Sequence, residues 1–225
     1  MARKSCLFQA VQGVVALGAA GVATYVCFVR PWHMRWGATD DEVARALPGD
    51  DLLPSPRVKV THAVTIQAPV DKVWPWVAQI GQGRGGFYSY EFIENAMGAD
   101  IHNADRILPE FQNPRVGDRL PLAQGGFGVP IVVVEPNRAL VVHGDTRQEG
   151  DDVQWLKPGD YMAVTWGWHL YWVDERATRL VERFSADYNP TFVNQVYFRA
   201  FMEPGAFVMQ RKMLLGIKER AERNA

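Results

Sequence analysis

Hydrophobic residues along this chain follow three patterns: an unbroken apolar run, stretches that alternate with polar residues, and stripes at helical spacing. Residues 58–67 alternate strictly, with Val58, Val60, Val64 and Ile66 on one face, and this predicts a half-buried strand. Further strands are predicted by β-branched and aromatic residues between turn signals, at residues 119–122, 129–135, 139–143, 161–174 and 179–188.

Helical spacing appears on both sides of these strands. Apolar residues from Val70 to Val77 recur at helical intervals behind Pro69, and Pro75 is expected either to bend this helix or to shift its start. A second short helix is predicted at residues 89–97. A final long helix is predicted to open at Pro204, with an apolar stripe formed by Val208, Met209, Met213, Ile217 and Ala221. The order of elements predicts the α+β class.

The unbroken apolar run covers residues 7–29 and contains no charged residue. Its length matches the roughly 20 residues that cross a bilayer, so it predicts a single N-terminal transmembrane helix. The alternative is a cleaved signal peptide, since Ala19 and Ala20 offer small residues for cleavage. Arg3 and Lys4 precede the run, and this short basic start favours a domain outside the cytoplasm.

The domain organisation follows from these patterns. Residues 1–30 are predicted to be a membrane anchor, residues 31–57 a proline-rich linker, and residues 58–225 one folded domain. Within the linker, residues 39–47 are expected to form a short helix that Thr39 caps.

Composition and charge exclude several classes of protein. The 225 residues are 48% hydrophobic with a net charge of -1, a profile that fits a folded domain and argues against nucleic-acid binding. Cys6 and Cys27 are the only cysteines, and both lie outside the predicted domain. The domain therefore has no cysteine for a disulfide, a thiolate metal site or a nucleophile. We expect no cofactor and no metal.

Three segments resemble the START-type superfamily of polyketide cyclases/dehydrases and lipid-transport proteins, also called SRPBCC proteins. They are VTIQAPVDKVWPWVAQIG (residues 64–81), GDRLPL (residues 117–122) and EPGAFVMQRKMLLGIKERAE (residues 203–222), within a resemblance that covers residues 58–224. The chain looks like a membrane-anchored bacterial subgroup. Residues 81–112 depart from the simplest family pattern, so the resemblance transfers no mechanism residue by residue.

The resemblance implies a helix-grip fold, in which a curved antiparallel β-sheet wraps around a long C-terminal helix. The space between sheet and helix is then a cavity for a mostly apolar ligand. Because members of the superfamily bind, transport or transform different molecules, the fold alone does not specify the chemistry.

His62 is the first candidate site residue, because it shares a strand face with valines and an isoleucine. A polar group in that position needs a partner or a ligand. It is either a hydrogen-bonded core histidine or a pocket residue that orients a polar atom of the ligand.

Aromatic residues and methionines supply the other ligand-binding candidates. Trp166 and Trp168 share one face of a strand, either as core residues or as the floor of a cavity. Tyr88 and Tyr90 follow the glycine-rich residues 81–86 and are interpreted as part of a lid. The predicted ligand-binding set is completed by two residues on the stripe of the last helix, Met209 and Met213.

A polar cluster at residues 100–106 is the second candidate for catalysis. His102 and Asp105 are three residues apart, so they meet only if this segment forms a helical turn. A histidine held by a carboxylate can transfer protons. The alternatives are a solvated surface cluster, in which Arg106 pairs with an acid, and a metal site without a recognised ligand spacing.

Three functions are compatible with the sequence. The first is a membrane-tethered, non-catalytic module that holds or transfers a lipid, a quinone or a polyketide-like molecule, with the lipid bilayer as its other partner. The second is an enzyme of the cyclase/dehydratase type, a lyase or isomerase, that uses His62, or His102 with Asp105, for proton transfer on an aromatic or polyketide substrate. The third is a structural subunit of a membrane complex. The sequence names no protein partner.

Overall fold

The computed structural model describes residue 12 and residues 16–148 and 159–223. The chain divides into two compact units, Met1–Met34 and Arg35–Ala225. In the smaller unit, residues 16–24 are helical and continue into η1 (Tyr25–Val29) and α2 (Arg30–His33).

The prediction of a single-pass membrane protein is wrong. Among the described residues, no helix combines the length and the apolar character that a membrane crossing requires. Residues 7–11 and 13–15 of the predicted span lie outside the described residues.

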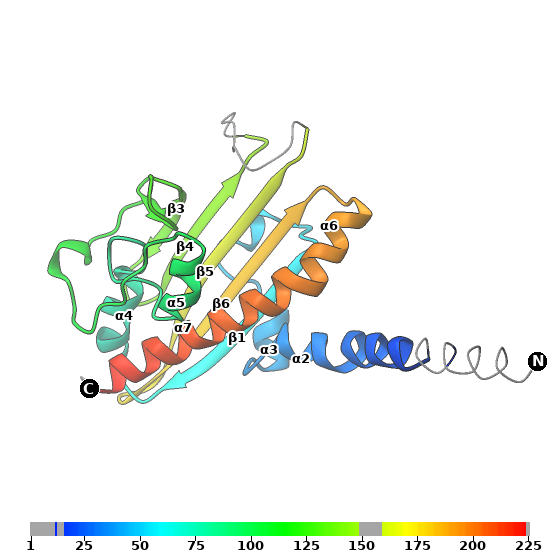
Figure 1. The fold of residues 1–225 in the computed structure, drawn as a ribbon. Coiled ribbons are helices and arrows are strands. Elements are labelled where there is room, and N and C mark those ends of the chain that lie inside the picture. Colours follow the sequence, from blue (N-terminus) through cyan, green and yellow to red (C-terminus); the bar gives the residue numbers. More distant parts are fainter. Residues whose placement is uncertain (1–11, 13–15, 149–158, 224–225) are drawn as a thin grey trace, which may run out of the picture. The chain divides into compact units, whose positions relative to one another are not determined.

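An antiparallel sheet forms the centre of the larger unit (Figure 1). Its six strands have the order β1-β6-β5-β4-β3-β2, and every neighbouring pair is antiparallel. The strands are β1 (Val58–Ile66), β2 (Arg119–Pro121), β3 (Gly128–Glu135), β4 (Ala139–Asp145), β5 (Met162–Asp174) and β6 (Ala177–Tyr188). These bounds confirm the strands expected from the sequence.

The helices of the larger unit are short except at its C-terminal end. They are α3 (Asp40–Ala44), η2 (Asp50–Leu52), α4 (Val70–Ala78), α5 (Glu91–Ala96), η3 (Pro109–Phe111), α6 (Phe192–Tyr197), η4 (Phe198–Met202) and α7 (Glu203–Arg223). Pro75 lies inside α4, so this helix does not begin after the proline. The arrangement of one antiparallel sheet and one long C-terminal helix fits the predicted helix-grip fold.

The last helix begins earlier than predicted. Helical backbone runs without a break from Phe192 through α6, η4 and α7, and Pro204 lies inside it rather than at its start. The π-helical turn η4 ends at Met202, two residues before Pro204. Since proline lacks an N–H and its ring crowds the preceding turn, a π-helical turn at this point lets the helix continue past it.

One face of the sheet, which we call the helix face, packs against α4 and α7. Met213, Leu214 and Ile217 of α7 and Trp76 of α4 belong to one buried apolar cluster with residues of β1, β3, β4, β5 and β6. Alternation places every second residue of each strand on this face, and burial of these apolar side chains is the main force that holds α7 to the sheet.

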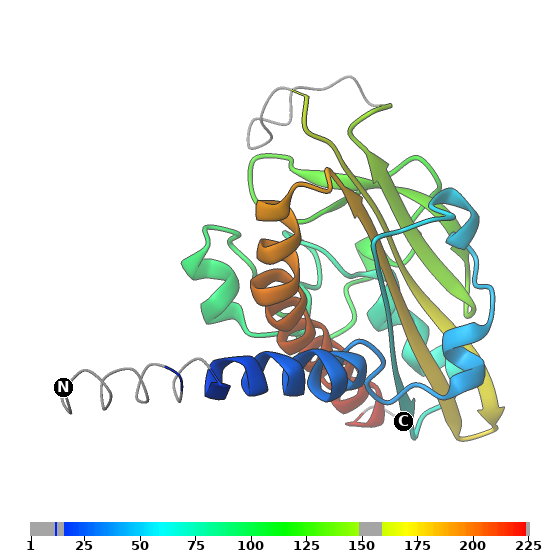
Figure 2. The same ribbon diagram turned by 90° about the vertical axis from the view of Figure 1, so that its right-hand side faces the viewer.

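The opposite face, the outer face, is covered by residues 38–53, which include α3 (Figure 2). Arg183 on β6 is almost fully buried there and donates to Asp50 Oδ2 at 2.7 Å and to the carbonyl oxygen of Glu42 at 2.8 Å. Arg179 forms two hydrogen bonds to the carboxylate of Glu42, at 2.8 and 2.9 Å. The segment interpreted as a linker therefore packs, from Ala38 on, as a layer on the sheet.

The short helix in this layer confirms the expected cap. The Thr39 side chain accepts from the backbone N–H of Glu42, and the Glu42 carboxylate accepts from the backbone N–H of Thr39. This reciprocal arrangement satisfies two backbone donors at the start of α3. The helix therefore has a defined first residue although it is short.

Candidate functional site

A buried hydrogen-bond network crosses three neighbouring strands on the helix face. His62 on β1 lies opposite Glu182 on β6, and His62 Nδ1 is 3.2 Å from Glu182 Oε2. The other carboxylate oxygen of Glu182 accepts from the indole nitrogen of Trp166 on β5, at 2.6 Å. The side chains of His62 and Glu182 are both fully buried. Both oxygens of this carboxylate therefore have a partner inside the protein.

Packing does not explain why this network exists. The neighbours of His62 and Glu182 on the same strand faces, Val60, Val64 and Leu180, are buried apolar residues. Taking a histidine and a carboxyl group out of water costs free energy, and a buried pair of this kind commonly contributes no more stability than apolar residues of similar size. We therefore interpret the network as the polar centre of a binding site.

Two aromatic rings lie against His62 and come from outside the sheet. The ring of Phe207 on α7 is 5.6 Å from the His62 ring, and that of Trp36 is 6.4 Å from it, both edge-on. Trp36 is fixed beside the edge strand β1, because its carbonyl oxygen accepts from the backbone N–H of Ala63 at 3.1 Å. The next residue, Gly37, has φ 73°, and a Cβ there would lie 2.1 Å from the carbonyl oxygen of Ala63. Only glycine, which has no Cβ, fits where the chain passes this close to β1.

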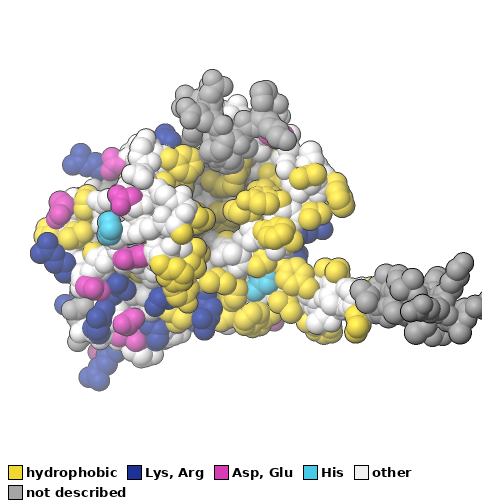
Figure 3. Space-filling model, in the orientation of Figure 1, with side chains coloured by type: hydrophobic (Ala, Val, Ile, Leu, Met, Phe, Trp, Pro, Cys, Tyr) yellow, Lys and Arg dark blue, Asp and Glu magenta, His cyan; other side chains and the backbone are white. Residues whose placement is uncertain are grey.

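Aromatic side chains also surround the other end of the network. The Trp166 ring stacks on Phe87 at 6.0 Å and lies 4.5 Å from Trp168 and 6.2 Å from Phe184. Trp166, Phe184 and Val164 are only half-buried, so this part of the helix face is open to solvent. Figure 3 shows the same side of the molecule hollowed between α5 and α6, with hydrophobic side chains around the hollow. The network thus lies beside an open, largely apolar space.

Trp168 adds a second polar atom to this region. The residue is fully buried, and its indole nitrogen has no hydrogen-bond partner among the described residues. A buried N–H that stays unpaired costs free energy, so it favours the binding of a hydrogen-bond acceptor next to it.

Tyr88 is the predicted ligand-binding residue that lies deepest in the core. Its hydroxyl donates to the carbonyl oxygen of Trp76 at 2.9 Å, and burial raises the pKa of this phenol. Gly216 of α7 packs so closely that a Cβ there would be 2.3 Å from the carbonyl oxygen of Tyr88. The preceding glycine-rich loop is closed by a β-bridge between Gly81 and Gly86. Tyr88 is thus fixed under α7 by its own contacts.

The remaining members of the predicted set are divided between core and surface. Met213 is buried in the main apolar cluster, and Met209 is half-buried on α7. Tyr90 is half-buried, with its ring 5.9 Å from that of Phe92 and under the ammonium group of Lys212. The structure thus brings together His62, Trp166 and Trp168, while Tyr88 and Met213 have structural contacts of their own.

His102 and Asp105 are not paired with each other. The segment that holds them forms no helical turn, so the condition for their contact is not met. His102 Nε2 instead lies 3.2 Å from Asp100 Oδ1, with the His102 side chain 78% exposed. Asp105 accepts from Arg220 of α7 at 3.0 Å. This arrangement is that of a solvated surface cluster.

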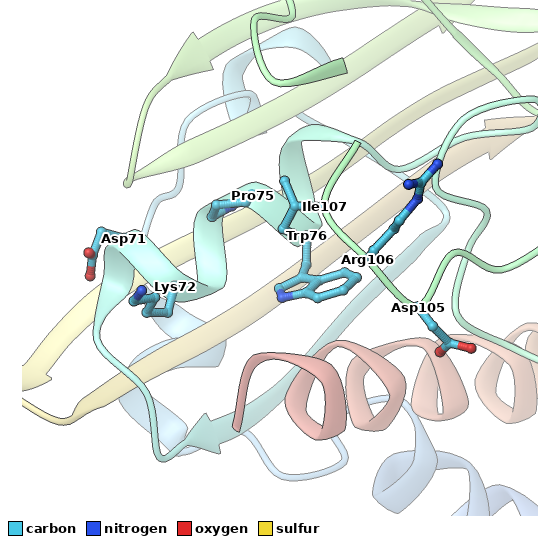
Figure 4. A pocket seen from close by; sticks show the side chains of 7 residues that line it. All are labelled: Asp71, Lys72, Pro75, Trp76, Asp105, Arg106 and Ile107. Carbon is cyan, nitrogen blue, oxygen red and sulfur yellow. The ribbon is translucent and has the colours of Figure 1, made fainter. Parts of the chain in front are cut away.

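A pocket of about 330 Å³ lies beside Asp105, between α4 and the segment that follows α5. Figure 4 shows Asp71 and Lys72 at one end of this pocket, Asp105 at the other and Trp76 between them. Its charged side chains are mostly exposed, and it holds neither a histidine nor a cysteine. In residues 16–148 and 159–223, no group of three or more His, Cys, Asp or Glu side chains is placed to hold a metal ion.

Sequence reasoning missed Glu182, Trp36 and Phe207. Glu182 had a readable signal, since it falls in the apolar phase of β6 between Leu180 and Phe184, just as His62 falls among valines. No sequence signal indicated that Trp36 contacts His62, because Trp36 lies in a segment without hydrophobic periodicity.

Comparisons with known proteins show weak matches only. No family model and no curated protein matches the chain. A similar solved structure is protein MLL2253 from Mesorhizobium loti, with 18% identity, coverage of 74% of this chain and 98% of that chain, and a TM-score of 0.42. DynU16 from the dynemicin biosynthetic locus has 16% identity, coverage of 71% and 47%, and a TM-score of 0.38.

A point mutant of norcoclaurine synthase from Thalictrum flavum has 14% identity, coverage of 74% and 94%, and a TM-score of 0.40. All of these matches are weak in sequence and in shape, so they carry no argument about function. Membership of the START-type superfamily stays a prediction, and the fold assignment rests on the strand order and the C-terminal helix.

Proposed function

We propose that the larger unit binds a hydrophobic small molecule on the helix face of the sheet, and that His62 and Glu182 position a polar atom of this molecule. The observation that carries the proposal is the fully buried His62–Glu182 contact beside half-buried aromatic side chains. Ligand sites of this kind are mostly apolar and contain a few polar groups that fix orientation. A lipid, a quinone or a polyketide-like molecule has the required combination of apolar surface and oxygen atoms.

The proposal predicts that the protein distinguishes two probes that differ by one hydroxyl group, 1-naphthol and naphthalene. We expect 1-naphthol to bind about tenfold more tightly, because one hydrogen bond to a buried polar centre contributes about 1.4 kcal/mol. In the double variant His62→Leu/Glu182→Met this preference should disappear while naphthalene still binds. Equilibrium dialysis of the full chain measures both affinities.

The matched control is Trp172→Leu, which removes an exposed tryptophan on the same sheet at the β5–β6 hairpin. It should retain the preference for 1-naphthol. If neither compound binds the wild-type protein, or if the double variant keeps the preference, the proposed function is overturned. If the expected preference is found, native mass spectrometry of the purified full chain can identify a co-purified molecule.

A second candidate function is proton transfer on a bound aromatic or polyketide-like substrate. It is favoured by the contact between His62 Nδ1 and a carboxylate oxygen, since a carboxylate beside an imidazole fixes the orientation of the ring, as acid–base catalysis by histidine requires. We expect such an enzyme to accelerate deuterium exchange next to the carbonyl of 2-tetralone in D2O, followed by NMR. His62→Gln should abolish the acceleration and leave probe binding intact, whereas His102→Gln should change neither. Exchange no faster than in buffer contradicts the enzymatic function.

A further inference from the structure

The helix that borders the hollow carries its apolar residues on the outside. On α6 and η4, the side chains of Phe192, Val193 and Phe201 are 81%, 72% and 67% exposed. Val196, Tyr197 and Met202 are also exposed. The spacing of Phe192, Val193, Val196, Tyr197 and Phe201 places these five residues on one half of the helix surface. Phe198 turns inward and stacks on Tyr188 at the end of β6, with ring centroids 3.7 Å apart. Figure 3 shows hydrophobic side chains gathered over α6.

A second exposed apolar group lies on α5, across the hollow. Phe92 and Met97 are 72% and 74% exposed. The hollow seen in Figure 3 therefore has hydrophobic side chains on both of its sides. A soluble protein seldom exposes so many large apolar residues next to one another unless they contact a partner.

Charge indicates the chemistry of this partner. Residues 188–202 contain no aspartate and no glutamate, and Arg199 is their only charged residue. A surface that has no acidic residue of its own, is rich in Phe, Val and Tyr and includes the basic Arg199 is suited to the headgroup region of a bilayer with anionic lipids. A bilayer is also the phase in which an apolar ligand dissolves, and this surface adjoins the hollow.

We propose that the exposed apolar side of α6 and η4 docks onto an anionic lipid surface. The protein then binds at the membrane surface without crossing the bilayer, and Phe192 and Phe201 enter the interfacial region. It places the opening of the hollow against the bilayer, so that an apolar molecule passes between the two without crossing water. The docking itself requires no ligand, and it can therefore be tested separately from the proposed ligand binding.

The direct test places a nitrobenzoxadiazole label on Phe201→Cys in a chain that also carries Cys6→Ser and Cys27→Ser. The matched control is the label on Trp172→Cys, since Trp172 is 69% exposed. Trp172 lies on β5 beside Thr178 at the start of β6, whereas α6 follows the other end of β6. Unlabelled vesicles of phosphatidylcholine with phosphatidylglycerol should raise the emission at position 201 several-fold, and doxyl-labelled lipid should quench it. The emission at position 172 should not change. Vesicles of phosphatidylcholine alone should give a weaker response.

A second measurement uses vesicle flotation of unlabelled protein. Phe192→Asp/Phe201→Asp should lower the partition coefficient by at least about tenfold, because two aromatic side chains no longer leave water. Trp172→Asp should leave it unchanged, and circular dichroism checks the fold of each variant. The proposal is overturned if the label at position 201 stays in water while the protein floats, since another part of the chain then makes the contact. It is equally overturned if that label is shielded without lipid in a concentration-dependent manner, since a second copy then covers this surface.

Discussion

His62→Ala is expected to lower the free energy of unfolding by about 3 kcal/mol, because it leaves one oxygen of the Glu182 carboxyl group buried without its partner. The double variant His62→Leu/Glu182→Met should lie within about 1 kcal/mol of the wild type, because it removes both buried polar groups and keeps most of the volume, and the half-buried Trp166 can donate its indole N–H to water instead. Urea denaturation followed by circular dichroism measures both. The ligand-binding test therefore uses the double variant, which we expect to stay folded, rather than His62→Ala.

The control for this prediction is the exposed contact between His102 and Asp100. His102→Ala should change the free energy of unfolding by less than about 0.5 kcal/mol, because solvent screens this pair. If His62→Ala is as mild as His102→Ala, then the His62–Glu182 contact does not have the buried character on which the proposed site depends.

Acid is expected to destabilise the fold through His169, which lies on the outer face of the sheet beneath residues 38–53. Burial, together with the nearby positive charge of Arg183, lowers the pKa of His169 to about 4. Neither ring nitrogen has a hydrogen-bond partner among the described residues. In the unfolded chain the same imidazole has its ordinary pKa near 6.5. The unfolded chain therefore binds a proton more readily than the folded one between these two values.

Because the folded-state pKa is lowered, the contribution of His169 is complete above about pH 6.5 and is lost as the pH falls toward 4. The loss amounts to about 3 kcal/mol if the whole shift is expressed. His169→Leu should be less sensitive to acid than the wild type over this range, as measured by urea denaturation at a series of pH values. His102→Gln controls for the removal of a histidine at an exposed position. Parallel pH profiles for wild type and His169→Leu would contradict the prediction.

The two histidines show how one sheet separates two environments. His62 and His169 lie on opposite faces, and each is almost completely buried. His62 faces aromatic rings and an open hollow, with Glu182 beside it, whereas His169 is covered by the layer that Arg179 and Arg183 hold in place. The first environment is suited to a ligand, and the second links the N-terminal part of the larger unit to the stability of the sheet.

Local patterns were sufficient for most of the fold. Alternation predicted β1, because a residue's face in a strand depends only on its position along the chain, and β-branched and aromatic residues between turn signals predicted the other strands. The same reasoning singled out His62 as a polar residue in an apolar row. It was misleading where a local signal had two meanings: Pro204 suggested the start of a helix, but a π-helical turn carries the helix through it. The apolar N-terminal run suggested a membrane span that no described helix provides.

The sequence by itself determined the secondary structure, the α+β class and the anomalous position of His62. Only the tertiary structure decided what surrounds that histidine. Glu182 is 120 residues away along the chain and becomes its partner through the pairing of β1 with β6. Trp36 and Phe207 reach it from segments before and after the sheet. Periodicity reports which side of a strand a residue occupies, but the identity of its neighbours depends on strand order and register, which long-range packing of the whole chain determines.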